Sequence, residues 1–223
     1  MRLTILFEDN HLLAVNKPAG VPTVPDASGD PSLLDAAKAY LKEKYSKPGE
    51  VYLGVVHRLD RPVGGVLLFA RTSKAASRLS SAWRTGEILK EYRGWSQARN
   101  PRAEAQGSGE VEQWLVKDEE RNVVRAVSEA RAAWERAKHA RTRWRIERAT
   151  VRGTFLELVP ESGRPHQLRM ACSALGLPLA GDLKYGAEQP LPDASIGLHA
   201  VRLVVPHPIG GVELVLESAA PAW

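Results

Sequence analysis

Cysteine is nearly absent from this sequence of 223 residues, and its hydrophobic runs are short. The single Cys172 excludes an internal disulfide and any zinc site built on cysteine ligands. No run of about 18 apolar residues occurs, so no membrane-spanning helix is predicted. The apolar start "LTILF" meets acidic residues too soon for a secretory signal. We therefore expect a cytoplasmic protein that does not enter a membrane.

The sequence also lacks the short motifs that hold nucleotides and metals. It contains no P-loop and no GxGxxG. His57, His166, His199 and His207 show neither HxH nor HxxxH spacing, and no cysteine pair accompanies them. We therefore expect neither a cofactor nor a metal.

Basic charge exceeds acidic charge, with 31 Lys and Arg against 26 Asp and Glu. The excess is concentrated in residues 121–152, which hold ten Lys or Arg against three Glu. One interpretation is a face that binds the phosphates of a polyanion. The other is a solvated helix face, because "SEARAAWERAKHARTRWRIERA" alternates charge with alanine. The sequence leaves both open.

Strand and helix patterns are mixed along the chain without strict βαβ alternation. Leu3–Phe7 and Leu12–Asn16 are predicted strands, "GVLLFA" is a buried strand, and a hairpin turns near Arg152-Gly153. Helices are predicted after Ser32, after Thr72 or Ser73, and after Pro165. This pattern favours an α+β fold with a mixed, largely antiparallel sheet and flanking helices. We expect a single domain over residues 1–223, with no separate N-terminal RNA-binding domain.

A charged cluster interrupts the apolar stretch "VVHRLDRPVGGVLLFART". Asp60 comes just before a turn and a buried strand, where an unpaired carboxylate costs several kcal/mol. A cation must therefore lie near it. Arg58, which shares a face with Asp60 on an extended backbone, Arg61 and a distant Arg are the candidates. An Asp that caps a turn, with surface salt bridges, is the plainer alternative.

Two further stretches combine basic residues with groups suited to nucleic acid. In "ESGRPHQLRMACSALG", Arg164, His166 and Arg169 precede or begin a predicted helix, although helix N-termini favour acidic residues. Such a start is either an anion site or a solvated helix end. In "LKEYRGW", Tyr92 is either a base-stacking ring beside basic residues or a packing aromatic.

Taken together, these stretches resemble the motifs of one enzyme family. "HRLDRPVGG" is similar to the H-R-L-D-x-x-[TV]-S-G signature of the RluA family of RNA pseudouridine synthases. "LKEYRG" resembles its K-x-Y motif, and "GRPHQLR" with "GDLKYGA" resembles its G-R-x-H-Q-[IL]-R and G-D-x-x-Y-G motifs. "ILFEDNHLLAVNKPAG" and "GLHAVRLVVPHP" resemble its first strands and its C-terminal elements. The resemblance covers nearly the whole chain.

The resemblance implies an isomerase that converts uridine to pseudouridine in structured ribosomal or transfer RNA, with no cofactor. It implies the pseudouridine synthase fold, an active site in a central cleft and Asp60 as the catalytic residue. By family position Arg169 is the cation paired with Asp60. Arg58 fills the space left by the flipped base or holds its phosphate, Tyr92 stacks on the uracil and Leu168 packs against it. We expect a monomer.

Two departures and two alternatives accompany this resemblance. Gly64 stands where the family usually has Ser, which predicts a looser turn, and Pro165 removes a backbone donor where Thr or His is common. One alternative is a catalytically silent RNA-binding protein on the same scaffold. The other is a hydrolase, which needs a second carboxylate. Asp182 is the other acid to consider, and we interpret it as a turn residue.

Overall fold

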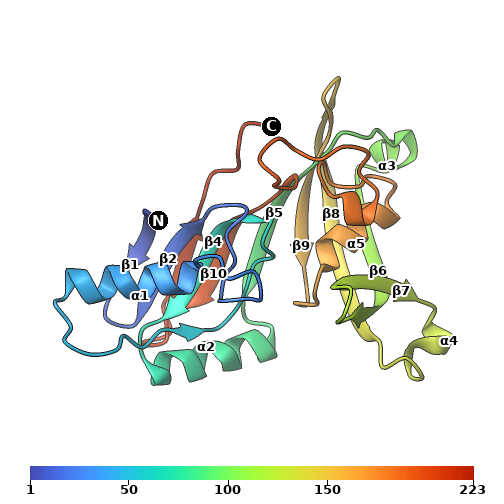
Figure 1. The fold of residues 1–223 in the computed structure, drawn as a ribbon. Helices are drawn as coiled ribbons and strands as arrows, with labels where there is room; N and C mark the ends of the chain where they lie inside the picture. Colours follow the sequence, from blue (N-terminus) through green and yellow to red (C-terminus); the bar gives the residue numbers. More distant parts are fainter. The chain divides into compact units, whose positions relative to one another are not determined.

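The computed structural model describes all residues, 1–223, and the chain divides into two compact units. Unit 1 contains residues 1–90 and 199–221, and unit 2 contains residues 91–198 and 222–223. The chain passes from one unit to the other within β5 (Leu89–Ser96) and β10 (Leu198–Pro206) (Figure 1). The expectation of a single domain over the whole chain stays a prediction.

The sheet of unit 1 places its strands in the order β1-β2-β4-β10. Their bounds are β1 Thr4–Glu8, β2 Leu12–Lys17 and β4 Gly64–Ala70, with short β3 (Gly54–Val55) beside β4 and β11 (Glu213–Glu217) beside β10. β10 pairs β4 in parallel, and the other pairs within this unit are antiparallel. The predicted first two strands are therefore confirmed. Asp9 closes the turn between them, since its carboxylate accepts from the backbone N–H of His11 and Leu12 at 2.7 Å.

Both helices of unit 1 begin at the caps expected from the sequence. α1 (Leu33–Lys44) starts after Ser32, whose hydroxyl accepts from the N–H of Asp35. α2 (Ser73–Thr85) starts after Thr72, whose hydroxyl accepts from the N–H of Ala75. Each bond satisfies an otherwise orphaned amide and fixes the helix start. In Figure 1, α1 crosses in front of the strands and α2 lies below them, and α2 packs on β2 and β4 through Ala75 and Leu79.

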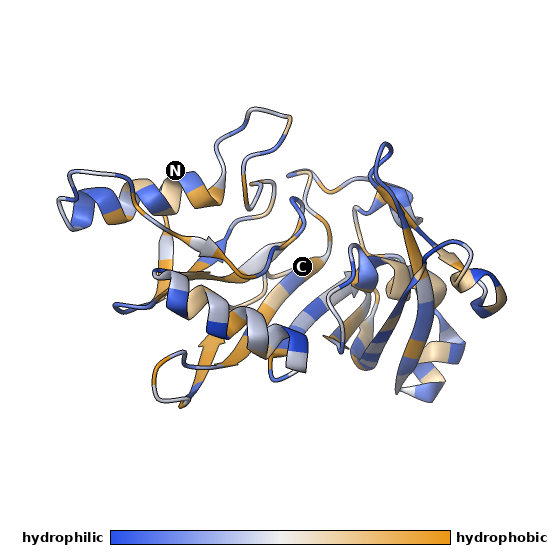
Figure 2. Ribbon diagram, turned by 90° about the horizontal axis from the view of Figure 1, so that it is seen from below, coloured by the Kyte–Doolittle hydropathy of each residue, from blue (hydrophilic) through white to orange (hydrophobic).

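The core of unit 1 explains why β4 is apolar throughout. All seven of its residues are buried, and this part of the sheet is hydrophobic in Figure 2. Val66 and Leu68 pack in one cluster with Ala75 and Leu79 of α2. Alternation along the strand directs the intervening side chains to the opposite face, where α1 lies (Figure 1). A strand covered on both faces needs apolar residues at every position.

Unit 2 is built on an antiparallel sheet in the order β5-β9-β8-β6-β7. Its strands are β6 Ser108–Asp118, β7 Val123–Val127, β8 Lys138–Thr150 and β9 Gly153–Pro160, so the hairpin predicted near Arg152-Gly153 is confirmed. Its helices are α3 Pro101–Gln106, α4 Glu129–Ala132, α5 Gln167–Ala174 and the 3-10 helix η1 Leu183–Tyr185. No helix in either unit is long and apolar enough to cross a membrane.

The helical interpretation of residues 121–152 is wrong, because the segment forms mainly β7 and β8, and only Glu129–Ala132 is helical. Along β8, Ala140, Thr142 and Trp144 are buried while the residues between them face outward. An outward-facing arginine therefore recurs at every second position of "ARTRWRI", which is the period of a strand. The alternation of charge with alanine earlier in the segment concealed this pattern.

Candidate active site

Asp60 lies on an irregular loop of unit 1 between β3 and β4. The backbone oxygen of Asp60 accepts from the N–H of Val63 at 3.0 Å, which forms the turn into β4. Leu59, directly before it, is 6% exposed and anchors the loop in the core. Asp60 itself is half-buried. The sequence correctly predicted a carboxylate at the entrance to a buried strand.

Lys17, at the end of β2, supplies a cation beside Asp60 that the sequence reasoning missed. Its side chain is fully buried, and Nζ donates to the backbone oxygens of Pro18 (3.0 Å) and Arg61 (3.1 Å). Burial lowers the pKa of Lys17 to about 7, while the negative charge of Asp60 opposes this shift. A lysine at the end of the apolar strand "LLAVNK", just before Pro18, was the available signal.

Residues 17–23 hold the Asp60 loop through the residues on either side of it. The hydroxyl of Thr23 donates to the backbone oxygen of Leu59 (2.9 Å) and accepts from the backbone N–H of Leu59 (3.3 Å). The N–H of Gly20 donates to the backbone oxygen of Arg61 at 2.8 Å. Nε of Arg61 returns a bond to the oxygen of Gly20 at 2.9 Å. These bonds leave the backbone at Asp60 little freedom.

The other charged residues of the cluster have separate tasks. Arg61 forms an ion pair with Asp30 and lies 4.0 Å from Asp26, so it ties the loop of residues 21–31 to the Asp60 loop. Arg58 is exposed. The four chargeable side chains of the cluster therefore differ in their surroundings: Arg61 links two loops, Arg58 faces outward, and Asp60 and His57 are the other two.

His57 is the histidine of that cluster, and its neutral imidazole supports β4. Its Nε2 accepts from the backbone N–H of Leu68 at 2.9 Å, in the middle of β4. The ring stacks on Trp83 with 4.8 Å between centroids. Burial lowers the pKa of His57 to about 3, and the charge of Lys90 adds to this shift. Because β3 is only two residues long, the imidazole takes the place of a strand partner.

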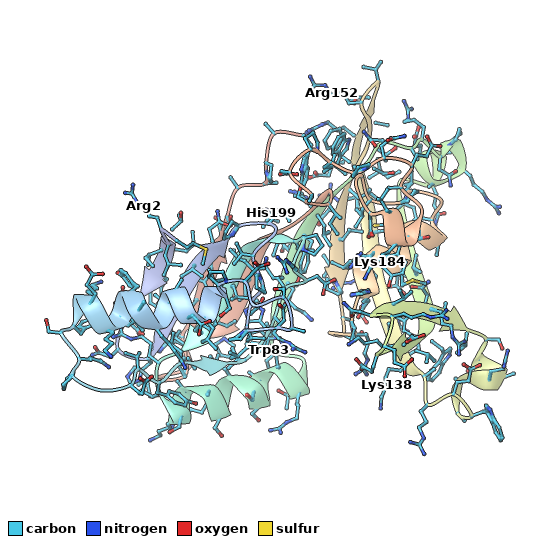
Figure 3. All side chains as sticks on the ribbon, in the orientation of Figure 1. Arg2, Trp83, Lys138, Arg152, Lys184 and His199 are labelled. Carbon is cyan, nitrogen blue, oxygen red and sulfur yellow. The ribbon has the colours of Figure 1, made fainter.

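Gly64 begins β4 within the sheet, so the expectation that it loosens a turn is wrong. A Cβ at Gly64 would lie 3.0 Å from Nδ1 of His199, which pairs with it across β10. The neighbouring Gly65 has a φ of +117°, and a Cβ there would lie 2.2 Å from the oxygen of Ala200. His199 in turn contacts Ser218, with 3.0 Å between Nε2 and Oγ. The two glycines therefore allow β10 to approach β4 (Figure 3 labels His199).

In unit 2, α5 carries a second buried charge. Arg169 is 5% exposed, and its Nε and one terminal nitrogen each donate to Asp182 at 2.7 Å. Its guanidinium also lies 4.8 Å from the ring centre of Tyr185. Asp182 precedes η1, but it is 1% exposed and bound in two places, so its interpretation as a turn residue alone was incomplete. The family-based pairing of Arg169 with Asp60 stays a prediction.

The start of α5 is closed by Gln167. Its side-chain nitrogen donates to the backbone oxygen of Arg141 (2.9 Å) and to the hydroxyl of Thr142 (3.0 Å), and its side-chain oxygen accepts from Ser162 and from the N–H of Arg164. These contacts pin α5 to β8. Pro165 lacks a backbone N–H, but it is exposed in the preceding turn. Water can therefore bond to any acceptor that this N–H would have served.

The residues predicted from the family pattern fall into two sets. Arg58 and Asp60 lie on one loop of unit 1. Tyr92, Leu168 and Arg169 belong to unit 2, where Tyr92 lies on β5 opposite Leu158 of β9 and the other two are consecutive on α5. Leu168 is 7% exposed and Tyr92 is half-buried.

Comparison with known proteins agrees with these motifs. The family model described as RNA pseudouridylate synthase matches residues 11–174. The dual-specificity RNA pseudouridine synthase RluA of Haemophilus influenzae is 32% identical over 220 residues, covering 97% of this chain and 92% of that protein. The ribosomal large subunit pseudouridine synthase D of Yersinia pestis is 31% identical over 233 residues, covering 98% of this chain and 67% of that protein.

A solved structure supports the same assignment. The human RNA pseudouridylate synthase domain containing 4 protein superposes with a TM-score of 0.77 at 25% identity, covering 98% of this chain and 89% of that chain. The α+β fold with a mixed, mostly antiparallel sheet is thus the pseudouridine synthase fold. The chain belongs to the RluA family of RNA pseudouridine synthases and is an isomerase.

Proposed function

We propose that the protein isomerises specific uridines of ribosomal or transfer RNA, with Asp60 as the catalytic carboxylate. The reaction breaks the bond between ribose C1′ and N1 of uracil and joins C1′ to C5. The proton on C5 is released and N1 ends protonated, so atoms balance without oxidation or hydrolysis. The observation that carries the proposal is the rigid setting of Asp60: a loop held by Thr23 and Gly20 and a buried cation, Lys17, beside it.

This setting suits a carboxylate that must stay ionised and aimed. An opposite charge nearby favours the ionised form of an acid, and Lys17 provides it. Hydrogen bonds on both flanking residues keep the carboxylate from drifting, and a displacement of about 1 Å can cost on the order of 100-fold in rate. Asp60 can then act as nucleophile or as base.

The target uridine has to leave its stack before Asp60 can reach it. Arg58 is exposed and has no carboxylate or carbonyl partner, so its side chain is available to fill the vacated space or to hold a phosphate. In unit 2, Tyr92 would stack on the uracil, Leu168 would pack against it, and Arg169 would bring positive charge to the reacting group. Arg169 has the fixed orientation such a role needs, because Asp182 binds two of its nitrogens.

Hydrolysis of the glycosidic bond is a weaker candidate. Two free carboxylates normally flank a bond that is hydrolysed. The other motif acid, Asp182, is bound to Arg169 through both oxygens and is 1% exposed. The named relatives act on RNA by isomerisation, and one is called dual-specificity while the other is called a ribosomal large subunit enzyme. Both RNA classes are therefore carried in the proposal.

The test is a map of pseudouridine across cellular RNA in cells that lack the protein. Cells rescued with the unmodified protein should regain one or a few modified uridines, and cells rescued with Asp60→Ala should not. Sites restored equally by both proteins would refute the role of Asp60. Free uracil released from RNA by the purified protein would instead favour hydrolysis.

A further inference from the structure

Trp134 is unlike every other tryptophan of the protein. It is 88% exposed and lies in the turn between α4 and β8, with no ring beside it. The other five are either buried or stacked on another ring: Trp83 on His57, Trp95 on Phe155, Trp114 near His139, Trp223 on Trp95, and Trp144 at 4% exposure. The indole of Trp134 therefore adds little to the packing of the fold and keeps its faces open to another molecule.

The turn that presents Trp134 is ordered by its own bonds. The side chain of Glu135 is 9% exposed and forms ion pairs with Arg125 of β7 and with Arg131 (3.1 Å) of α4. The backbone N–H of Glu135 donates to the oxygen of Arg131 at 3.0 Å, and that of Ala137 donates to Ala132 at 2.8 Å. The indole is therefore held outward on a fixed support.

Unpaired positive charge adjoins this indole. Arg136 and Lys138 are exposed and have no carboxylate partner. Farther along β8 the outward arginines are instead matched across the sheet: Arg141 with Glu112, Arg143 with Glu161 and Arg145 with Glu157. Figure 3 shows Lys138 at the start of β8 and Arg152 in the turn after its end. Free cations and an exposed aromatic residue occur together at the end with Lys138.

We propose that the turn of residues 128–138 is an RNA-stacking platform, in which Trp134 stacks on an unpaired base and Arg136 and Lys138 bind the adjoining phosphates. The inference rests on the RNA isomerisation proposed above and adds a contact outside the family motifs. Aromatic rings beside basic side chains are the usual means of holding single-stranded nucleotides. A protein partner fits less well, because interface cores are depleted in charged residues and here a single apolar side chain stands between exposed charged residues in the sequence.

The experiment measures binding of bulk transfer RNA and of a ribosomal RNA fragment rich in stem-loops. All variants carry Asp60→Asn, so that the RNA is not converted during titration. Trp134→Ala should weaken binding about 5- to 150-fold, which corresponds to ~1–3 kcal/mol for one stacked base. Trp134→Phe should stay within about threefold of the parent, since it keeps a stacking face. Val151→Ala, at the exposed tip of the β8–β9 hairpin, is the matched control and should bind like the parent.

Salt dependence separates stacking from charge. Trp134→Ala should leave the slope of log affinity against log salt unchanged, whereas Arg136→Ala or Lys138→Ala should each reduce it by about 1. Parent-like binding by Trp134→Ala, or an altered oligomeric state with intact RNA affinity, would overturn the platform while leaving the isomerase proposal standing. If the Asp60→Asn parent binds no RNA, the isomerase proposal fails, and the platform fails with it.

Discussion

The two units each hold an aspartate near a buried cation, and the two arrangements differ in how the cation is used. In unit 2, Arg169 donates two bonds of 2.7 Å to Asp182, and both side chains are almost fully buried. In unit 1, Lys17 donates to the backbone oxygens of Pro18 and Arg61 and acts on half-buried Asp60 through its charge. In unit 2 the buried cation binds its aspartate directly. In unit 1 it binds backbone oxygens, and this is the setting in which we propose that Asp60 acts on a substrate.

The largest difference between the two aspartates should appear in turnover. We expect Asp60→Asn to lower the rate of pseudouridine formation by about 10³-fold or more, because it removes the only carboxylate assigned to the chemistry. RNA affinity should change by no more than a few-fold, since phosphate contacts dominate binding. Single-turnover kinetics with a defined RNA, together with a binding titration, measure both quantities. Normal turnover by this variant would contradict the catalytic assignment.

For Asp182, the aspartate of unit 2, the main effect of substitution is expected on stability. Asp182→Asn should lower the free energy of unfolding by about 3–5 kcal/mol, because it breaks the buried ion pair between Asp182 and Arg169. Urea unfolding followed by circular dichroism measures this change. Asp30→Asn, which breaks the exposed ion pair with Arg61, is the matched control and should unfold within about 1 kcal/mol of the unmodified protein. Equal losses in the two variants would show that Asp182 contributes no more to stability than an aspartate at the surface.

A smaller effect should follow when the hold on the Asp60 loop is loosened. Thr23→Val keeps the shape of the side chain but leaves the backbone groups of Leu59 without their hydroxyl partner. We expect kcat to fall about 10- to 100-fold through misplacement of Asp60, with KM nearly unchanged.

Thr23→Ser is the control for that variant, since it retains the hydroxyl. It should restore kcat to within a few-fold of the unmodified protein. If Val and Ser behave alike, or if both change KM instead of kcat, the hydroxyl does not position the catalytic loop.

The sequence predicted local features of the fold well. The caps at Ser32 and Thr72 could be predicted because a hydroxyl residue directly before a helical pattern usually caps the helix. The buried strand "GVLLFA" could be predicted because it is apolar on both faces. The partners of charged residues could not be predicted. Lys17 lies 43 positions before Asp60, and Asp182 lies 13 positions after Arg169. Such pairings depend on tertiary packing, which neither propensity nor period encodes.

The last prediction compares two histidines of unit 1 with opposite pKa shifts. The pKa of His57 falls to about 3 on folding, so the folded state resists its protonation. Its contribution is present above the unfolded pKa of about 6.5 and is lost as the pH falls below that value, at about 1 kcal/mol between pH 7 and pH 5.5. His207 has a raised pKa, because the oxygen of Ile209 and the carboxylate of Asp9 bind its ring. Its contribution is present below pH 6.5 and lost at higher pH. The free energy of unfolding, measured at several pH values, should therefore depend less on pH over this acidic range in His57→Gln. In His207→Gln it should fall more steeply toward acid, by a few tenths of a kcal/mol. An acidic slope unchanged by His57→Gln would show that the imidazole is not the neutral partner of the Leu68 amide.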